Sequence, residues 1–158
     1  MAPGGSICGT AEPVRPMMAP AATTFVDTNV LLYAYDNKPD HRCKVAKEPV
    51  GQLWDSGTGV VSTQVLQEFY FNATKAYKLA MPRTQARRTL ALYARWRVIP
   101  TDAQLIMAAS LLEEEHTISF WDALIVQAAL RASATFLVSE VLQDGRRFGS
   151  LTVRNPFP

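Results

Sequence analysis

Cysteine and histidine are scarce in this chain, and the few that occur are not clustered. The 158 residues include two cysteines, Cys8 and Cys43, which are too few for a disulfide framework. The two histidines, His41 and His116, lie far apart among charged residues, so we expect solvated side chains rather than metal ligands. These shortages exclude a disulfide-stabilised secreted domain and a cysteine–histidine zinc site, and they favour a reducing cytoplasm.

Long hydrophobic runs and phosphate-binding loops are also missing. No apolar run approaches the roughly 20 residues of a membrane span, and the N-terminus lacks the basic start and apolar core of a signal peptide. No glycine-rich phosphate loop or dinucleotide fingerprint is present. The formal net charge of +2 neither requires nor excludes a nucleic-acid partner. We therefore expect a cytoplasmic protein without membrane association.

The composition divides the chain into a tail and one domain. Residues 1–22 are rich in Ala, Pro and Gly and have no hydrophobic period, which predicts a flexible N-terminal tail. Met17 and Met18, just before the first predicted strand, suggest a later natural start of translation. Residues 23–158 have the length of a single domain.

Strands alternate with helices along this domain. The predicted strands cover residues 24–26, 60–62, 98–100 and 135–139, with a short edge strand at 151–153. A first helix is predicted to start directly after Asp27 with an apolar face at residues 30–32. Further predicted helices cover residues 41–56, 63–80, 83–96, 102–116 and a segment from 119 onwards. Pro49 is expected to kink or break the second helix. The pattern indicates an α/β fold in which a parallel sheet of about four to five strands is sandwiched by helices.

Three acids occur at equivalent places in this pattern. Asp27 ends the first strand, Glu68 lies on a helix that starts just after a strand, and Asp122 opens a mostly apolar helix. The carboxyl ends of parallel strands and the following helix starts meet at one edge of a sheet, so the three carboxylates could converge there. Each acid taken alone has a simpler interpretation, as a helix cap, a surface helix acid or a helix-start acid.

Convergent carboxylates without basic partners repel one another, and a divalent cation relieves that repulsion. Oxygen-only ligands, with no suitable cysteine or histidine, favour Mg²⁺ or Mn²⁺ over zinc. Such a centre can activate water and stabilise charge on a phosphoryl oxygen. The sequence therefore predicts a metal-dependent site for phosphodiester chemistry.

Four segments together resemble a known family. They are Phe25-Val26-Asp27-Thr28-Asn29, the segment from Ser62 to Tyr70, the segment from Ile118 to Ile125, and the C-terminal part from Phe136-Leu137-Val138-Ser139-Glu140 to Asn155-Pro156-Phe157. From about residue 24 to the end, the chain is similar to PIN-domain ribonucleases, the fold of VapC-type toxins, with the acids in the expected order.

The resemblance implies a metal-dependent endoribonuclease in which the three acids bind the metal. It also implies that cleavage of the RNA gives a product with a 5′-phosphate. Thr28 and Asn29 would support the first acid, and Ser139 would lie near the metal. It also implies a toxin of a type II toxin–antitoxin system, neutralised by a small cognate antitoxin, and often a homodimer.

One position departs from the family pattern. The family commonly carries a fourth acid two residues past the Ser or Thr that ends the last long strand, and here that position is Val141. Glu140 should point the other way because side chains alternate along a strand. Asp144 could curl back as a further metal ligand, or Asp144-Gly145 could be a simple turn. An alternative function follows, in which a catalytically impaired PIN-like module binds RNA or an antitoxin.

Basic side chains are the candidates for RNA contact. Arg146 and Arg147 follow the last long strand closely and are the preferred candidates, because they could lie beside the acids. Other basic residues gather on two predicted helices, where a solvated face is the simpler interpretation: Lys75, Lys78, Arg83, Arg87, Arg88, Arg95 and Arg97. Tyr77 and Tyr93 could stack on bases, although a core or interface role is the simpler expectation.

A different enzyme class also places an Asp at the end of its first strand. Phosphatases that form an aspartyl phosphate carry a second Asp two residues later, where this chain has Asn29. This difference disfavours the phosphatase interpretation.

Overall fold

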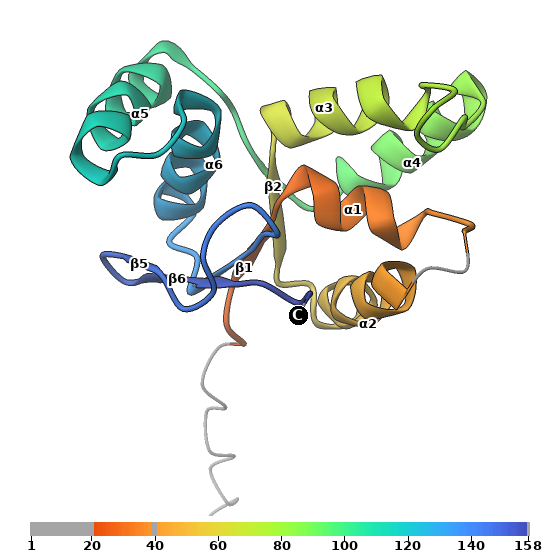
Figure 1. The fold of residues 1–158 in the computed structure, drawn as a ribbon, viewed down its shortest axis with the longest axis horizontal. Helices are drawn as coiled ribbons and strands as arrows, with labels where there is room; N and C mark the ends of the chain where they lie inside the picture. Colours follow the sequence, from red (N-terminus) through yellow and green to blue (C-terminus); the bar gives the residue numbers. More distant parts are fainter. Residues whose placement is uncertain (1–20, 39–40, 158) are drawn as a thin grey trace, which may run out of the picture.

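The computed structural model describes residues 21–38 and 41–157. Within these residues, a six-stranded sheet has the order β3-β2-β1-β4-β6-β5 (Figure 1). Its strands are β1 (Thr24–Val26), β2 (Gly59–Ser62), β3 (Arg97–Ile99), β4 (Phe136–Val138), β5 (Arg147–Phe148) and β6 (Leu151–Arg154). The helices are α1 (Thr28–Ala34), α2 (His41–Ser56), α3 (Thr63–Ala73), α4 (Arg83–Tyr93), α5 (Ala103–His116) and α6 (Phe120–Arg131). The predicted α/β class is confirmed, whereas most of the predicted tail lies outside the described residues.

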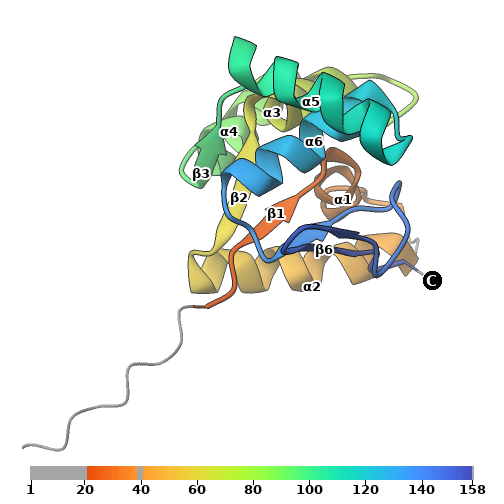
Figure 2. The same cartoon turned by 90° about the vertical axis from the view of Figure 1, so that its left-hand side faces the viewer.

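The sheet is parallel from β3 to β6. β1 lies at its centre and pairs with β2 on one side and β4 on the other, with Phe25 opposite both Val60 and Leu137. Helix α2 lies against one face and α6 against the other (Figure 2). The chain moves outward from β1 to β3 and then crosses back to β4. The carboxyl ends of β1 and β4 therefore form the switch point at which open α/β sheets place ligands.

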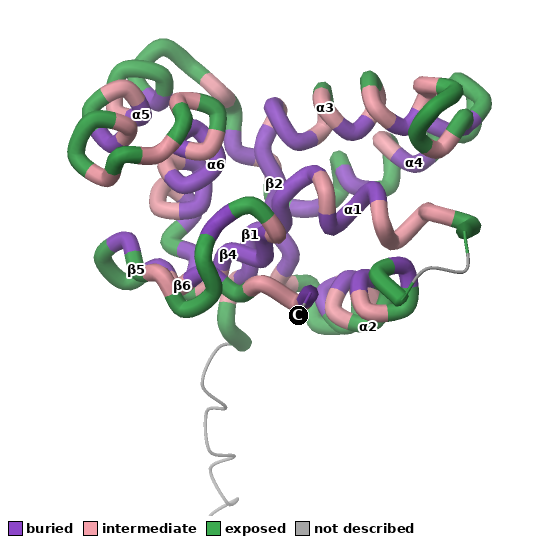
Figure 3. Tube along the Cα trace, viewed as in Figure 1, coloured by how far each residue is buried: buried purple, intermediate pink, exposed green. Residues whose placement is uncertain are grey.

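The hydrophobic core follows the central strands. Phe25, Val61 and Leu137 are fully buried, and α1 adds Val30 and Leu31. Burial on both faces is typical of parallel strands covered by helices. Figure 3 shows this buried centre and the exposed outer side of α5. Among the described helices, none has the length and apolar character needed to cross a membrane.

Three helices differ from their predictions, α4 by ending at Tyr93 rather than at residue 96. Helix α2 continues through Pro49, because Ala46, Val50 and Leu53 bury one face of it and outweigh the lost hydrogen bond. Helix α3 ends at Ala73 rather than near residue 80. There the Thr74 hydroxyl donates to the Tyr70 carbonyl, a local bond that competes with helix continuation.

The C-terminal strands also differ from the prediction of a last edge strand. Strand β6 lies inside the sheet between β4 and β5, where Leu137 is opposite Val153. The edge position belongs to the two-residue strand β5, which pairs antiparallel with β6. Gly149 makes the tight turn between them with a φ of +58°. A two-residue strand is too short to produce a detectable hydrophobic pattern.

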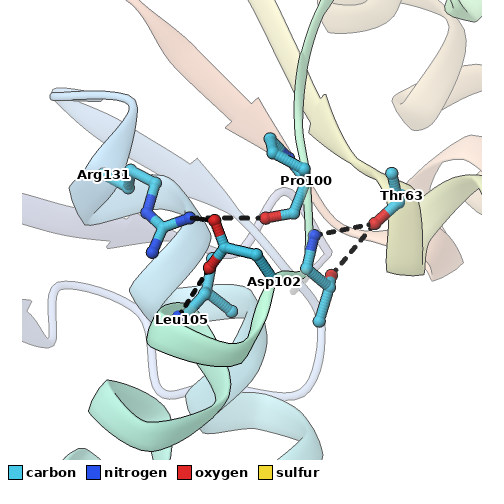
Figure 4. Close-up of polar contacts among 6 residues, drawn as sticks. Thr63, Pro100, Asp102, Leu105 and Arg131 are labelled. Carbon is cyan, nitrogen blue, oxygen red and sulfur yellow. Dashed lines mark hydrogen bonds and ion pairs between the residues drawn. The ribbon is translucent and has the colours of Figure 1, made fainter.

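Polar contacts of the segment that follows β3 hold helices α3 and α6 in place (Figure 4). The Thr63 hydroxyl, in the first turn of α3, accepts a 3.0 Å hydrogen bond from the backbone N–H of Thr101. Arg131, the last residue of α6, forms a 2.8 Å ion pair with Asp102, and the guanidinium lowers the pKa of that carboxyl. Asp102 also caps α5 by accepting a 2.9 Å hydrogen bond from the Leu105 N–H. The segment after β3 thus braces both α3 and α6.

Candidate active site

Asp27 lies at the centre of the switch point. It follows β1 directly and is the N-cap residue of α1, with an extended backbone. Its Oδ1 accepts a 2.7 Å hydrogen bond from the Thr28 N–H, and its Oδ2 accepts a 2.8 Å bond from the Ser139 hydroxyl. Asp27 is 7% exposed and Ser139 is fully buried. Neutral donors therefore fix the carboxylate, and no cation neutralises it among the described residues.

Glu68 is held beside Asp27 by hydrogen bonds from α1 and α3. The Thr28 hydroxyl donates a 2.7 Å hydrogen bond to Glu68 Oε2, and Gln64 Nε2 donates a 2.9 Å bond to Glu68 Oε1. Gln64 lies one helical turn before Glu68, so both side chains project from the same face of α3. Each oxygen of this carboxylate is thereby oriented by a different helix.

Asp122 comes from the first turn of α6. The Ser119 hydroxyl caps this helix by accepting from the Asp122 N–H at 3.1 Å, and it donates to Asp122 Oδ2 at 2.7 Å. Gln64 Nε2 also reaches the carbonyl of Trp121 at 3.4 Å, which links α3 to the start of α6. The third acid is therefore oriented locally and tied to the helix that carries the second.

The three acids line one pocket of about 130 Å³. Its other lining residues are Thr28, Asn29, Gln64, Trp121, Ile125 and Val141. The pKa of Asp27 is raised from 3.8 to about 6, chiefly by burial, and the negative charges of Glu68 and Asp122 contribute in the same direction. The hydrogen bonds from Ser139 and Thr28 oppose this shift. The pocket thus concentrates negative charge around the buried Asp27.

The chemical types of the side chains that line the pocket suit a hard divalent cation. The wall offers carboxylate, amide and hydroxyl oxygens and no thiol or imidazole, which is the chemistry that Mg²⁺ and Mn²⁺ prefer. Each oxygen of Asp27 accepts one hydrogen bond and keeps a second lone pair. Within the described residues, no group of three or more His, Cys, Asp or Glu side chains is arranged to hold an ion. The site therefore fits a metal in chemistry but not in the spacing of its carboxylates.

A family comparison identifies this architecture. The model of the PIN domain family matches residues 24–141, which is most of the chain. The chain belongs to the PIN domain family. Among curated proteins, none matches this chain.

Solved structures share the fold of this PIN domain. A toxin–antitoxin complex from Klebsiella pneumoniae has a TM-score of 0.64 at 18% identity, covering 85% of this chain and 98% of that one. VapBC2 from Rickettsia felis, bound to a promoter DNA fragment, has a TM-score of 0.60 at 22% identity, covering 84% and 98%. VapC20 from Mycobacterium tuberculosis, a Sarcin-Ricin loop cleaving toxin, has a TM-score of 0.54 at 23% identity, covering 73% and 87%. At these identities the likeness shows a shared fold alone.

The segment after β4 contains the position where the family commonly has a fourth acid. Val141 lines the acid pocket of this PIN domain and is 57% exposed, and its N–H donates to the Ser139 hydroxyl. Glu140 points elsewhere and pairs with Arg42 at 3.3 Å. Asp144 is exposed and does not line the pocket, and its Oδ1 accepts from the Asn155 N–H. The turn interpretation of Asp144 agrees with this placement, and the pocket receives an apolar side chain where the family commonly has an acid.

The two predicted RNA-binding arginines of this PIN domain lie outside the pocket lining. Arg146 donates to the His116 carbonyl at 2.6 Å and lies over the ring of Phe148. Arg147 is exposed on the edge strand β5 and remains accessible. His41 is exposed, as expected, whereas His116 is half-buried. Of the pair, Arg147 is the better placed to contact a ligand.

Sequence reasoning missed two side chains that orient the acids of this PIN domain. Gln64 donates to Glu68, but its helical position is equally typical of a surface glutamine. Its Oε1 is buried without a hydrogen-bond partner among the described residues, although the donating amide is well placed. Ser119 stands three residues before Asp122, a capping-box spacing that the sequence does display. The contact between α3 and α6 adds the second role of Gln64, its bond to the Trp121 carbonyl.

Proposed function

We propose that this PIN domain is a metal-dependent endoribonuclease and the toxin of a toxin–antitoxin pair. The observation that carries the proposal is the convergence of Asp27, Glu68 and Asp122 on one pocket at the switch point of the sheet. The raised pKa of Asp27 supports it, because strongly perturbed acids gather at functional sites. Residues 23–158 would form the single catalytic domain, acting in the cytoplasm.

The described carboxylates line one pocket but are not grouped around an ion, so the proposal requires the three acids to come together on Mg²⁺ or Mn²⁺. When bound, the ion would supply activated water and stabilise charge on the phosphoryl oxygens. The chain's own residues prepare the site for this chemistry. Ser139 and Thr28 fix the two oxygens of Asp27. Gln64 holds Glu68 from the α3 side, and Ser119 holds Asp122. Neutral donors keep the carboxylates oriented without cancelling the negative charge that attracts a cation.

An antitoxin partner is proposed on the fold likeness. The similar structures from Klebsiella pneumoniae and Rickettsia felis are toxin–antitoxin complexes, and this chain covers 98% of each matched chain. A homodimer is also proposed. Its support is a row of exposed apolar side chains on α5, where Met107 is 66% and Leu111 is 68% exposed. Sedimentation of the purified chain, compared with a Leu111→Lys variant, tests the dimer.

A second candidate function has one observation in its favour. Val141 places an apolar side chain in the pocket wall at the position of the expected fourth acid. A catalytically impaired module that binds RNA or an antitoxin would keep the fold and lose metal affinity. Metal-independent RNA binding without cleavage would support this candidate.

Cleavage of a mixed RNA pool tests the enzyme proposal. The natural chain and an Asp27→Asn variant are purified identically and assayed with Mg²⁺ or Mn²⁺. We expect cleavage by the natural chain only, and its loss in chelator. Equal cleavage by both proteins would indicate a contaminant and refute the site assignment. No cleavage by either protein would refute the enzyme and leave the binding module.

A further inference from the structure

A second pocket lies beside the acids, between α1 and the segment that follows α3. It has a volume of about 220 Å³ and is larger than the acid pocket. Asn29, Tyr33 and Asp36 line it from α1 and the turn that ends it, spaced so that they share one side of the helix. Tyr77 and Lys78 line it from the other side. Figure 1 shows α3 lying along α1, and the two helices are in contact.

Asn29 lines both pockets, so the two are adjacent. From Asn29 to Tyr33, one turn of α1 advances about 6 Å at the usual rise per residue, and Asp36 follows beyond the end of the helix. The second pocket therefore extends away from the acids along α1. A polymer whose backbone passes the acids can continue into it without leaving the surface of α1.

One wall of the pocket is held rigidly. The ring of Tyr33 packs edge-on against Phe157, with centroids 5.1 Å apart. Its hydroxyl accepts a 2.9 Å hydrogen bond from Arg42. A side chain restrained at both its ring and its hydroxyl loses little further freedom when a ligand binds. The Tyr33 side of the pocket is thus preorganised, with Arg42 also lying over the tyrosine ring.

The opposite wall is exposed and cationic. Tyr77 is 72% exposed, so the core role considered for it is excluded. Lys78 is exposed on this side, and Lys38 is exposed on the α1 side. Within residues 21–38 and 41–157, neither ammonium group forms an ion pair. An exposed aromatic ring that lines one pocket together with two lysines is a combination used for binding single-stranded nucleic acid.

We propose that this pocket binds an unpaired nucleotide of the RNA substrate, next to the phosphodiester at the acids. The ring of Tyr77 stacks on the base, and Lys38 and Lys78 contact the flanking phosphates. The carboxylate of Asp36 and the amide of Asn29 are available to the polar edge of the base. This assignment rests on the proposed ribonuclease function and specifies its substrate as single-stranded at the cleavage site.

The pocket favours RNA over a protein ligand because of its position. The acid pocket repels phosphate unless a cation is present, so the strand needs positive charge on either side of it. Lys38 and Lys78 supply that charge on the α1 side, and the exposed Arg147 on β5 is the candidate beyond β4. A base readily stacks on an aromatic ring whatever its identity, which suits an exposed tyrosine.

Fluorescence anisotropy with labelled single-stranded RNA of random sequence tests the proposal. All variants carry Asp27→Asn, so that the RNA stays intact. We expect Tyr77→Ala to weaken binding about fivefold or more, whereas Tyr77→Phe keeps the ring and retains affinity. Replacing Lys38 and Lys78 together by Ala should reduce the slope of log affinity against log salt by about 1.4. Replacing the exposed Lys44 and Lys47 of α2 by Ala removes the same charge elsewhere and should leave the slope unchanged.

The outcomes separate this pocket from the enzyme proposal. Unchanged RNA affinity in the Tyr77→Ala and double-lysine variants would overturn the pocket, even if the natural chain cleaves RNA. Tyr77-dependent binding without cleavage would support the pocket and refute only the enzyme. Loss of antitoxin binding with unchanged RNA binding would overturn the proposal in favour of a protein ligand. Thermal unfolding of every variant establishes that the fold is intact.

Discussion

The Thr28 hydroxyl donates a 2.7 Å hydrogen bond to Glu68 across 40 residues of sequence. The backbone N–H of the same threonine donates to Asp27 at 2.7 Å. One residue at the start of α1 therefore contacts two of the three acids. Its side chain is buried, so these bonds are shielded from competing water.

Replacing Thr28 by Val tests this link, because Val has nearly the same shape but no hydroxyl. Loss of a hydrogen bond to a carboxylate should reduce the free energy of unfolding by about 1–2 kcal/mol. We expect the rate of RNA cleavage to fall by about tenfold or more, since Glu68 loses an orienting donor. Thr28→Ser restores the hydroxyl and should recover most of the activity. Equal activities of the Val and Ser variants would contradict the role of the hydroxyl.

Asp27→Asn should change how stability depends on pH. The pKa of Asp27 is raised from 3.8 to about 6, so the folded chain binds this proton more tightly than the unfolded chain does. Folding stability from this group is therefore greatest below pH 3.8 and declines as the pH rises to about 6. At neutral pH we expect the Asn variant to be more stable by up to about 3 kcal/mol.

Urea unfolding at several pH values measures this effect. The difference in unfolding free energy between Asp27→Asn and the natural chain should grow through the acidic range and then level off. A difference that is independent of pH would contradict the raised pKa. Mg²⁺ should raise the melting temperature of the natural chain more than that of the variant, because binding to the folded state stabilises it.

Gln64→Met tests whether the amide positions Glu68. Methionine fills a similar volume but removes the donors to Glu68 and to the Trp121 carbonyl. We expect cleavage to fall several-fold, with a stability cost of about 1 kcal/mol. Gln64→Glu instead places a second carboxylate beside Glu68, so the acidic limb of the pH–rate profile should move to higher pH. An unchanged profile in the Glu variant would refute this positioning role.

Val141→Asp tests the missing fourth acid. Because Val141 is 57% exposed and lines the acid pocket, a carboxylate can be added there with little desolvation. We expect tighter Mn²⁺ binding by isothermal titration calorimetry, together with faster RNA cleavage. Gln143→Asp adds the same charge two residues further on and outside the pocket lining, so it serves as the matched control. Equal Mn²⁺ affinities in the two variants would show that position 141 has no special role.

The sequence was most informative where local chemistry decides structure. Asp27 follows a β-branched and aromatic strand and precedes cap-forming residues, so both its strand end and its helix start are visible in five residues. Ser62 and Ser119 likewise precede their helices at capping spacing. The order of strands and helices then follows from their alternation.

Other features depend on contacts between distant segments, which a single sequence does not encode locally. The link that Gln64 makes to the Trp121 carbonyl requires α6 to pack beside α3. Strand β6 is internal only because β5 pairs with it, and β5 has two residues. Tyr77 has no distinguishing pattern in sequence, and only its exposure beside Lys78 separates a ligand contact from a core aromatic.

Ser139 reaches Asp27 from 112 residues further along the chain. During synthesis, Asp27 and Glu68 are made long before Ser139, and β4 must join β1 before the hydroxyl can meet the carboxylate. The acid pocket is therefore among the last parts of the domain to be completed. For a chain whose proposed activity is RNA cleavage, this order leaves the site incomplete until synthesis of the domain is nearly finished.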